Sequence, residues 1–146
     1  MLMDKDDGMR EILIEQAMAA RLKAYAPYSG YLVGAALLAD SGKVYCGCNI
    51  ENAAYGPSNC AERTAVFKAV SEGERKFCAI AVVGGRREDA CEDSSFAYPC
   101  GVCRQVLREF CDDDFLIIAA KGKDKYEILR LGQLLPHSFG ATQLMA

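Results

Sequence analysis

Two short, uninterrupted apolar segments restrict the fold of this chain more than any other feature of its sequence. They are residues 78–83 (CAIAVV), which are followed by Gly84 and Gly85, and residues 115–120 (FLIIAA). A strand with one face in water alternates apolar and polar residues, whereas a strand covered on both faces is apolar throughout. These segments therefore predict an α/β protein whose central sheet has helices on both faces.

The rest of the sequence supplies the other elements of such a fold. Apolar residues at helical spacing predict a helix over 9–25, and the turn residues of 40–42 join two strand-like segments into a hairpin. The predicted elements are helix 9–25, strands 33–38 and 43–49, helix 60–70 capped by Asn59, strand 78–83, helix 101–110, strand 115–120 and strand 126–129. We therefore expect a three-layer α/β/α architecture with a mixed sheet of about five strands.

Length and composition describe one ordinary globular domain. Of 146 residues, 51% are hydrophobic and 25% are charged. We expect a single domain over 1–146, with a flexible N-terminal segment at about 1–8. The formal net charge of −3 offers no basic surface for nucleic acid. No apolar segment approaches the roughly 18 residues of a membrane span.

The eight cysteines are expected to lie in a reducing compartment. The first residues are acidic and polar, which argues against a secretory signal, so we expect a cytoplasmic protein without disulfides. In that compartment cysteines stay free, react or bind metal.

Three of these cysteines are spaced as metal ligands. Two residues separate Cys100 from Cys103, so both sulfurs can reach one ion, and Cys60 begins another predicted helix. The positive end of a helix favours thiolate over thiol, which is the form that zinc binds. Three protein ligands leave a tetrahedral zinc one position short, as in catalytic sites. The single histidine, His137, is not expected to be a ligand.

Each part of this arrangement also has a simpler explanation. A single Cys-x-x-Cys pair can be a redox pair, and Glu62 can complete a capping box with Asn59 at a helix start. The other five cysteines can pack as small hydrophobic residues, and these are Cys46, Cys48, Cys78, Cys91 and Cys111. Only the joint occurrence of the motifs favours chemistry.

The cysteine motifs belong to a longer pattern. Cys60-Ala-Glu62 followed by Pro99-Cys-x-x-Cys103 resembles the signature of zinc-dependent nucleoside and nucleobase deaminases. Further segments are similar to the small, homotetrameric cytidine deaminases: 25–29 (YAPYS), 33–37 (VGAAL), 47–55 (GCNIENAAY), 60–65 (CAERTA), 99–105 (PCGVCRQ) and 134–136 (LLP). The resemblance extends over roughly residues 10–144, and it implies a cytidine deaminase-like fold.

The resemblance also implies an activity and roles for particular residues. The activity is hydrolytic deamination of cytidine and 2′-deoxycytidine to uridine and 2′-deoxyuridine, in pyrimidine salvage. One Zn2+ per subunit would be held by Cys60, Cys100 and Cys103, with Glu62 as the proton shuttle. The implied substrate contacts are Asn49 and Glu51 on the ribose hydroxyls, the Ala61 backbone on the polar edge of the base, and Tyr31 where the family usually has Phe.

Further implied roles concern the subunit boundary and the ligand sulfurs. Tyr55 and Phe139 would form pocket walls across that boundary, in a homotetramer with shared active sites. Arg63, and secondarily Arg104, are expected to donate hydrogen bonds to the ligand sulfurs, which would offset the negative charge of three thiolates.

Three other functions fit parts of the same pattern. A deaminase of a cytosine-nucleoside antibiotic would share the zinc motif. A structural zinc-binding module would close the fourth coordination position and would have no need of Glu62. A thiol–disulfide protein using Cys100 and Cys103 would bind no stoichiometric metal.

Overall fold

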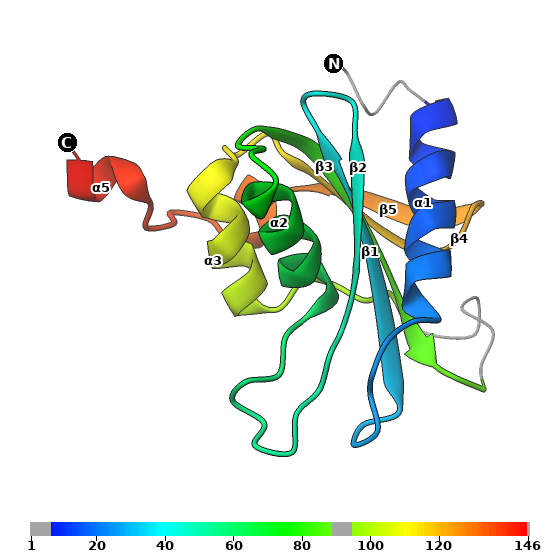
Figure 1. Ribbon diagram of the computed structural model, residues 1–146. Helices are drawn as coiled ribbons and strands as arrows, with labels where there is room; N and C mark the ends of the chain where they lie inside the picture. Colours follow the sequence, from blue (N-terminus) through cyan, green and yellow to red (C-terminus); the bar gives the residue numbers. More distant parts are fainter. Residues whose placement is uncertain (1–6, 89–94, 146) are drawn as a thin grey trace.

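The computed structural model describes residues 7–88 and 95–145, which form a five-stranded sheet with helices on both faces (Figure 1). The elements in chain order are α1 (Asp7–Arg21), β1 (Tyr31–Ala39), β2 (Val44–Cys48), α2 (Ala61–Ser71), β3 (Phe77–Arg86), α3 (Gly101–Phe110), β4 (Leu116–Gly122), β5 (Lys125–Arg130), α4 (Leu131–Leu134) and α5 (Ala141–Met145). The strand order is β2-β1-β3-β4-β5. Only β3 and β4 are parallel among these neighbours, so the sheet is mixed, as predicted.

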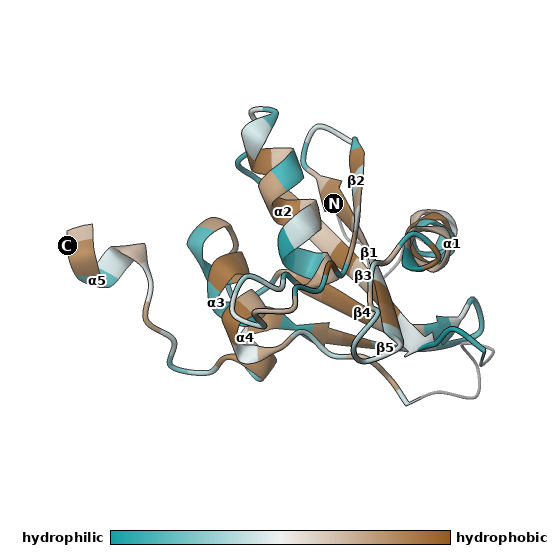
Figure 2. Ribbon diagram, turned by 60° about the horizontal axis from the view of Figure 1, so that its bottom comes forward, coloured by the Kyte–Doolittle hydropathy of each residue, from teal (hydrophilic) through white to brown (hydrophobic). Residues whose placement is uncertain are grey.

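The sheet separates two hydrophobic clusters because successive side chains of a strand point to opposite faces. One cluster joins Ile80, Val82 and Ile117 to apolar residues of α2 and α3. The other joins Ala79, Ala81 and Val83 of β3 to Leu13 and Ile14 of α1. Figure 2 shows α1 on one side of the strands and α2 with α3 on the other. The predicted three-layer α/β/α class is therefore confirmed.

The first helix ends earlier than its apolar spacing predicts. Backbone N–H groups of residues 22–24 donate to carbonyls three residues earlier, at 3.0–3.3 Å, which tightens the last turn. Tyr25 then forms an isolated β-bridge with Ile50, far along the chain, and this pairing ends the helical path. At the other end, residues 1–6 of the predicted flexible segment 1–8 lie outside the described residues. Its last two residues, Asp7 and Gly8, begin α1.

The third strand continues through the glycine pair that was expected to end it. Gly84 pairs with Val33 and Gly85 with Leu32, so β3 runs on to Arg86 along β1. The helix predicted at 101–110 has the observed bounds of α3, whereas α4 and α5 were not predicted. No helix in the described part of the chain is long and apolar enough to cross a membrane.

Candidate active site

Two helices begin at the same place and bring three sulfurs together. Cys60 is the N-cap residue of α2, Cys100 is the N-cap residue of α3, and Cys103 lies in the first turn of α3. The Sγ atoms of Cys60 and Cys100 are 3.7 Å apart, and those of Cys100 and Cys103 are 3.5 Å apart. Tetrahedral Zn–S bonds of about 2.3 Å require sulfurs about 3.8 Å apart. The three sulfurs therefore fit one zinc ion.

The charges around the sulfurs favour a bound cation. Arg63 donates a hydrogen bond from Nη2 to Cys60 Sγ at 3.2 Å. The pKa of Cys60 is lowered to about 5, first by a hydrogen bond from the Cys103 thiol and then by Arg63. The pKa of Cys103 is raised because its thiol donates to Cys60 and because it is buried. The thiolate form is thus favoured at Cys60, and a metal would displace the protons that remain on the sulfurs.

Glu62 is a buried carboxyl group beside this sulfur set. Its side chain lies in the first turn of α2, and the residue is only 4% exposed. Burial raises the pKa of Glu62 to about 7. The alternative in which it forms a capping box with Asn59 is wrong, because Cys60 is the N-cap of α2 and no side chain caps this helix. Asn59 instead donates from Nδ2 to Thr64 Oγ1 at 3.2 Å. Glu62 is therefore available for proton transfer near neutral pH.

A pocket of about 520 Å³ opens beside the sulfurs. It is lined by Cys60, Cys100, Glu62 and Arg63, by four residues expected at the substrate, Tyr31, Asn49, Glu51 and Ala61, and by Val33, Ser58, Asn59, Phe96, Ala97 and Tyr98. The segment 96–98 was not anticipated as a pocket wall. The only signal for it in the sequence is its position directly before Pro99 and Cys100.

Asn49 and Glu51 are held at the pocket by hydrogen bonds to the chain around β1. The side-chain amide of Asn49 accepts from Val33 N and donates to Tyr31 O, both at 2.8 Å. It thus forms with the β1 backbone the two hydrogen bonds that a neighbouring strand would form. Glu51 accepts from Ser29 Oγ at 2.5 Å and from two backbone N–H groups, which lowers its pKa. A carboxylate has about four acceptor positions and an amide nitrogen has two donors, so both side chains keep capacity for a ligand.

Three expected site residues lie elsewhere. Tyr55 is 74% exposed and lines a second cavity together with Glu51 and Ser58, whereas Phe139 is 57% exposed. Neither lines the pocket beside the sulfurs. Arg104 donates from Nε to Pro99 O at 2.7 Å and from Nη1 to Leu134 O at 2.8 Å. These described hydrogen bonds of its side chain go to backbone carbonyls and not to a ligand sulfur.

The remaining cysteines lie outside the three-sulfur group. Cys46, Cys48, Cys78 and Cys111 are partly buried and pack against the hydrophobic clusters, whereas Cys91 lies outside the described residues. None of the cysteines in 7–88 and 95–145 forms a disulfide. Among the described residues, the three-cysteine group is the only cluster of potential ligands close enough to hold a metal, and it does not include His137.

Comparison with known families matches this geometry. The family model for the cytidine and deoxycytidylate deaminase zinc-binding region matches residues 8–119, which include all three clustered cysteines. The chain belongs to this deaminase family. Membership identifies the metal of the three-sulfur group as Zn2+.

Individual members of the deaminase family are similar over most of the chain. The cytidine deaminase of Sporosarcina psychrophila is 47% identical over 134 residues, which cover 92% of this chain and 93% of that protein. The crystal structure of cytidine deaminase from Burkholderia pseudomallei is 47% identical with a TM-score of 0.78, and the match covers 88% of this chain and 97% of that chain. A blasticidin-S deaminase of Bacillus cereus is 33% identical over 92 residues, 62% of this chain and 66% of that protein.

Proposed function

We propose that this chain is a zinc-dependent cytidine deaminase that converts cytidine and 2′-deoxycytidine to uridine and 2′-deoxyuridine in pyrimidine salvage. The observation that carries the proposal is the position of Glu62. A buried carboxyl with a pKa of about 7 directly follows one zinc ligand and faces an open pocket large enough for a nucleoside. A structural zinc module would need neither the carboxyl nor the pocket.

The reaction replaces the C4 amino group of the base with oxygen from water. Held by Cys60, Cys100 and Cys103, zinc would supply the nucleophile by lowering the pKa of a bound water toward 7. Glu62 takes the proton from that water and delivers it to N3 of the base. The hydroxide that remains attacks C4, and Glu62 takes the proton of the newly attached oxygen and transfers it to the amino group. The C4–N bond then breaks, the C4 carbonyl forms, and ammonia leaves. Arg63 draws charge from the Cys60 sulfur and so keeps the metal acidic.

The pocket residues have separate tasks in this proposal. Asn49 and Glu51 bind the ribose hydroxyls with their remaining hydrogen-bonding positions, and a carboxylate suits two vicinal hydroxyls. The Ala61 backbone contacts the polar edge of the base, and the ring of Tyr31 packs beside the base. The whole chain acts as one domain in a reducing cytoplasm, which the free cysteines support.

The surface of the chain supports a homotetramer with shared sites. Tyr55 and Phe139 are exposed aromatic residues that do not line the pocket beside the sulfurs in their own chain, and each would complete that pocket in a neighbouring subunit. One Zn2+ would be bound per subunit.

An antibiotic nucleoside is the less favoured substrate. The similarity to the blasticidin-S deaminase covers 62% of this chain, whereas the similarity to the cytidine deaminase of Sporosarcina psychrophila covers 92%. Parallel assays with cytidine and with blasticidin S separate the two substrates, and faster turnover of the antibiotic would reverse this order.

The test of the function is zinc analysis together with a cytidine-to-uridine assay on the same preparation. The variant Glu62→Gln keeps the size of the side chain but cannot take up the proton, so we expect it to retain zinc and to lose kcat by about 10²- to 10⁴-fold. Glu72→Gln, the same change at the exposed C-terminal end of α2, serves as the control. This variant should keep both its zinc and the wild-type kcat. Wild-type protein that binds zinc without deaminating cytidine, or Glu62→Gln protein with near-wild-type kcat, would contradict the proposal.

A further inference from the structure

The three zinc ligands differ in how well the fold protects them. Cys103 is buried, Cys60 is partly buried and bonded to Arg63, but Cys100 is exposed. The residues before it, 95–99, form no helix or strand. The sulfur most open to water and to competing chelators is therefore carried at the end of an irregular segment.

Arg104 holds the backbone on both sides of Cys100. Its own backbone N–H donates to Cys100 O at 2.9 Å, and its side-chain Nε donates to Pro99 O at 2.7 Å. The carbonyl of Pro99 belongs to the same planar peptide group as the nitrogen of Cys100. Fixing both carbonyls restricts both peptide planes that meet at the Cα of Cys100, and thereby the direction of its side chain.

The other end of the guanidinium is attached to the core of the molecule. Nη1 donates to Leu134 O at 2.8 Å, and Leu134 packs against the cluster between the sheet and helices α2 and α3. Arg104 thus anchors the Pro99–Cys100 peptide to Leu134, a residue packed against the core.

We propose that Arg104 is a positioning residue for the zinc ligand Cys100: by joining the carbonyl of Pro99 to that of Leu134, it holds the most exposed sulfur in place and slows the loss of zinc. This role rests on the zinc site of the proposed function but not on its substrate. A failure to turn over cytidine would leave it intact, because its test follows the metal.

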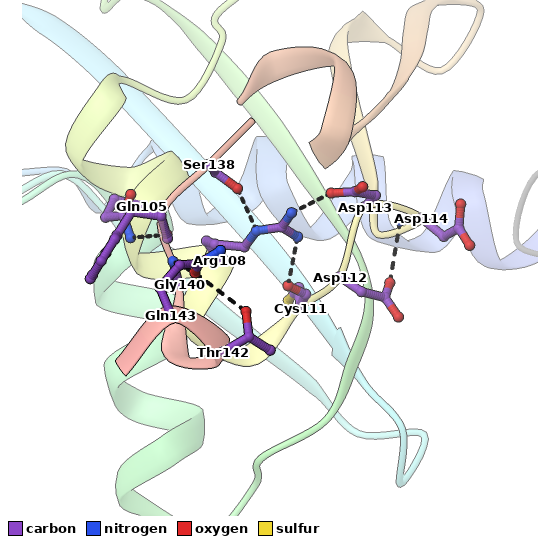
Figure 3. A network of polar contacts seen from close by, with 11 residues as sticks. Gln105, Arg108, Cys111, Asp112, Asp113, Asp114, Ser138, Gly140, Thr142 and Gln143 are labelled. Carbon is purple, nitrogen blue, oxygen red and sulfur yellow. Dashed lines mark hydrogen bonds and ion pairs between the residues drawn. The ribbon is translucent and has the colours of Figure 1, made fainter. Parts of the chain in front are cut away.

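Arg108 provides a matched comparison on the same helix. It lies one turn further along α3 and binds Ser138 Oγ at 2.6 Å, Cys111 O at 3.3 Å and the carboxylate of Asp113 (Figure 3). It therefore holds the same C-terminal segment as Arg104, but none of its described hydrogen bonds reaches residues 99 or 100. A change at Arg108 disturbs the docking of that segment and leaves the peptide before Cys100 tied.

The experiment measures zinc release from protein loaded with one Zn2+ per chain, mixed with an excess of a chromogenic chelator. Arg104→Met keeps an unbranched, largely aliphatic side chain and removes both side-chain donors. Since groups that orient metal ligands typically change metal affinity 10- to 100-fold, we expect release about tenfold faster than in wild type, with Arg108→Met within about twofold of wild type. Arg104→Lys, which keeps the charge but has one nitrogen, should release zinc at an intermediate rate.

Equal release from Arg104→Met and Arg108→Met would overturn the proposal, whether both are fast or both are slow. The first result would assign the effect to general docking of the C-terminal segment, and the second would show that the Pro99 tie is dispensable. If Arg104→Met does not fold, Arg104→Lys is compared with Arg108→Met, and equal rates in that pair overturn the proposal in the same way.

Discussion

The ring of Tyr31 lies where a side chain on Gly84 would otherwise be. A Cβ at position 84 would come within 2.8 Å of the Tyr31 hydroxyl oxygen, 3.0 Å of its Cε1 and 2.8 Å of Ala97 Cβ. Both Tyr31 and Ala97 line the pocket. The glycine therefore provides the room for a tyrosine at the position where the family usually has phenylalanine.

Gly84→Ala is expected to push Tyr31 and Ala97 toward the pocket. Overpacking of this kind lowers the free energy of unfolding by about 1–3 kcal/mol. Because both displaced side chains line the pocket, we also expect KM for cytidine to rise about tenfold while zinc content is unchanged. In a Tyr31→Phe background the hydroxyl contact is gone, so Gly84→Ala should raise KM by less. The difference should correspond to at least about 0.5 kcal/mol of binding free energy. Steady-state kinetics of the four proteins measures this coupling, and Gly140→Ala, whose nearest neighbours are 3.6 Å away, is the control. Strictly additive effects would mean that the two positions act independently.

At the scale of helices and strands, local sequence signals predicted which elements form. Pairing between residues far apart in the chain determined where some of these elements end. The bounds of α3 could be predicted because Pro99 and the apolar spacing of 101–110 are both local. The continuation of β3 could not, since Gly84 and Gly85 are held by pairing with β1, more than 50 residues earlier in the chain. The end of α1 shifted for the same reason, through the bridge between Tyr25 and Ile50.

The site divides in the same way. The spacing of Cys60, Cys100 and Cys103 predicted the sulfur cluster because each ligand stands at a helix start, which is a local feature. The acceptors of Arg104 could not be predicted, because they depend on where residues 99 and 134 meet in space. The walls at 96–98 lie on an irregular segment, for which no periodicity exists.

The contact between β2 and α2 sets the position of two site residues. A Cβ at Gly47 would lie 2.5 Å from both Ala61 O and Ala65 N, which are backbone atoms that cannot rotate away. Gly47→Ala must therefore shift the helix that begins at Cys60 and carries Glu62. We expect the free energy of unfolding to fall by about 1–3 kcal/mol and zinc release to become faster. Urea unfolding measures the free energy of unfolding, and mixing with a chelator measures the rate of zinc release. Gly140→Ala is the matched control. Zinc release unchanged in a folded Gly47→Ala protein would contradict this.

At the scale of the whole molecule, the C-terminal end extends away from the sheet. Helix α5 has no buried residue, and it projects beyond the rest of the chain in Figure 1. The segment before it is held to α3 by side chains: Gln105 Nε2 donates to Phe139 O at 2.9 Å, and Arg108 binds Ser138. Phe139 is thus held in a defined position with its ring in solvent, which suits a surface that meets another subunit.

Shared sites make a prediction that subunit mixing can test. Light scattering should give a mass about four times the 15.9 kDa of one chain, as expected for a homotetramer. If Phe139 completes a neighbour's pocket, Glu62→Gln and Phe139→Ala fail in different ways. A Phe139→Ala subunit beside a Glu62→Gln subunit has its own intact Glu62 and receives its neighbour's intact Phe139. Co-refolding the two variants should therefore yield more activity than the sum of the separate proteins. Activity equal to that sum would place Phe139 outside the neighbouring site, because no combination of subunits would then restore a complete pocket.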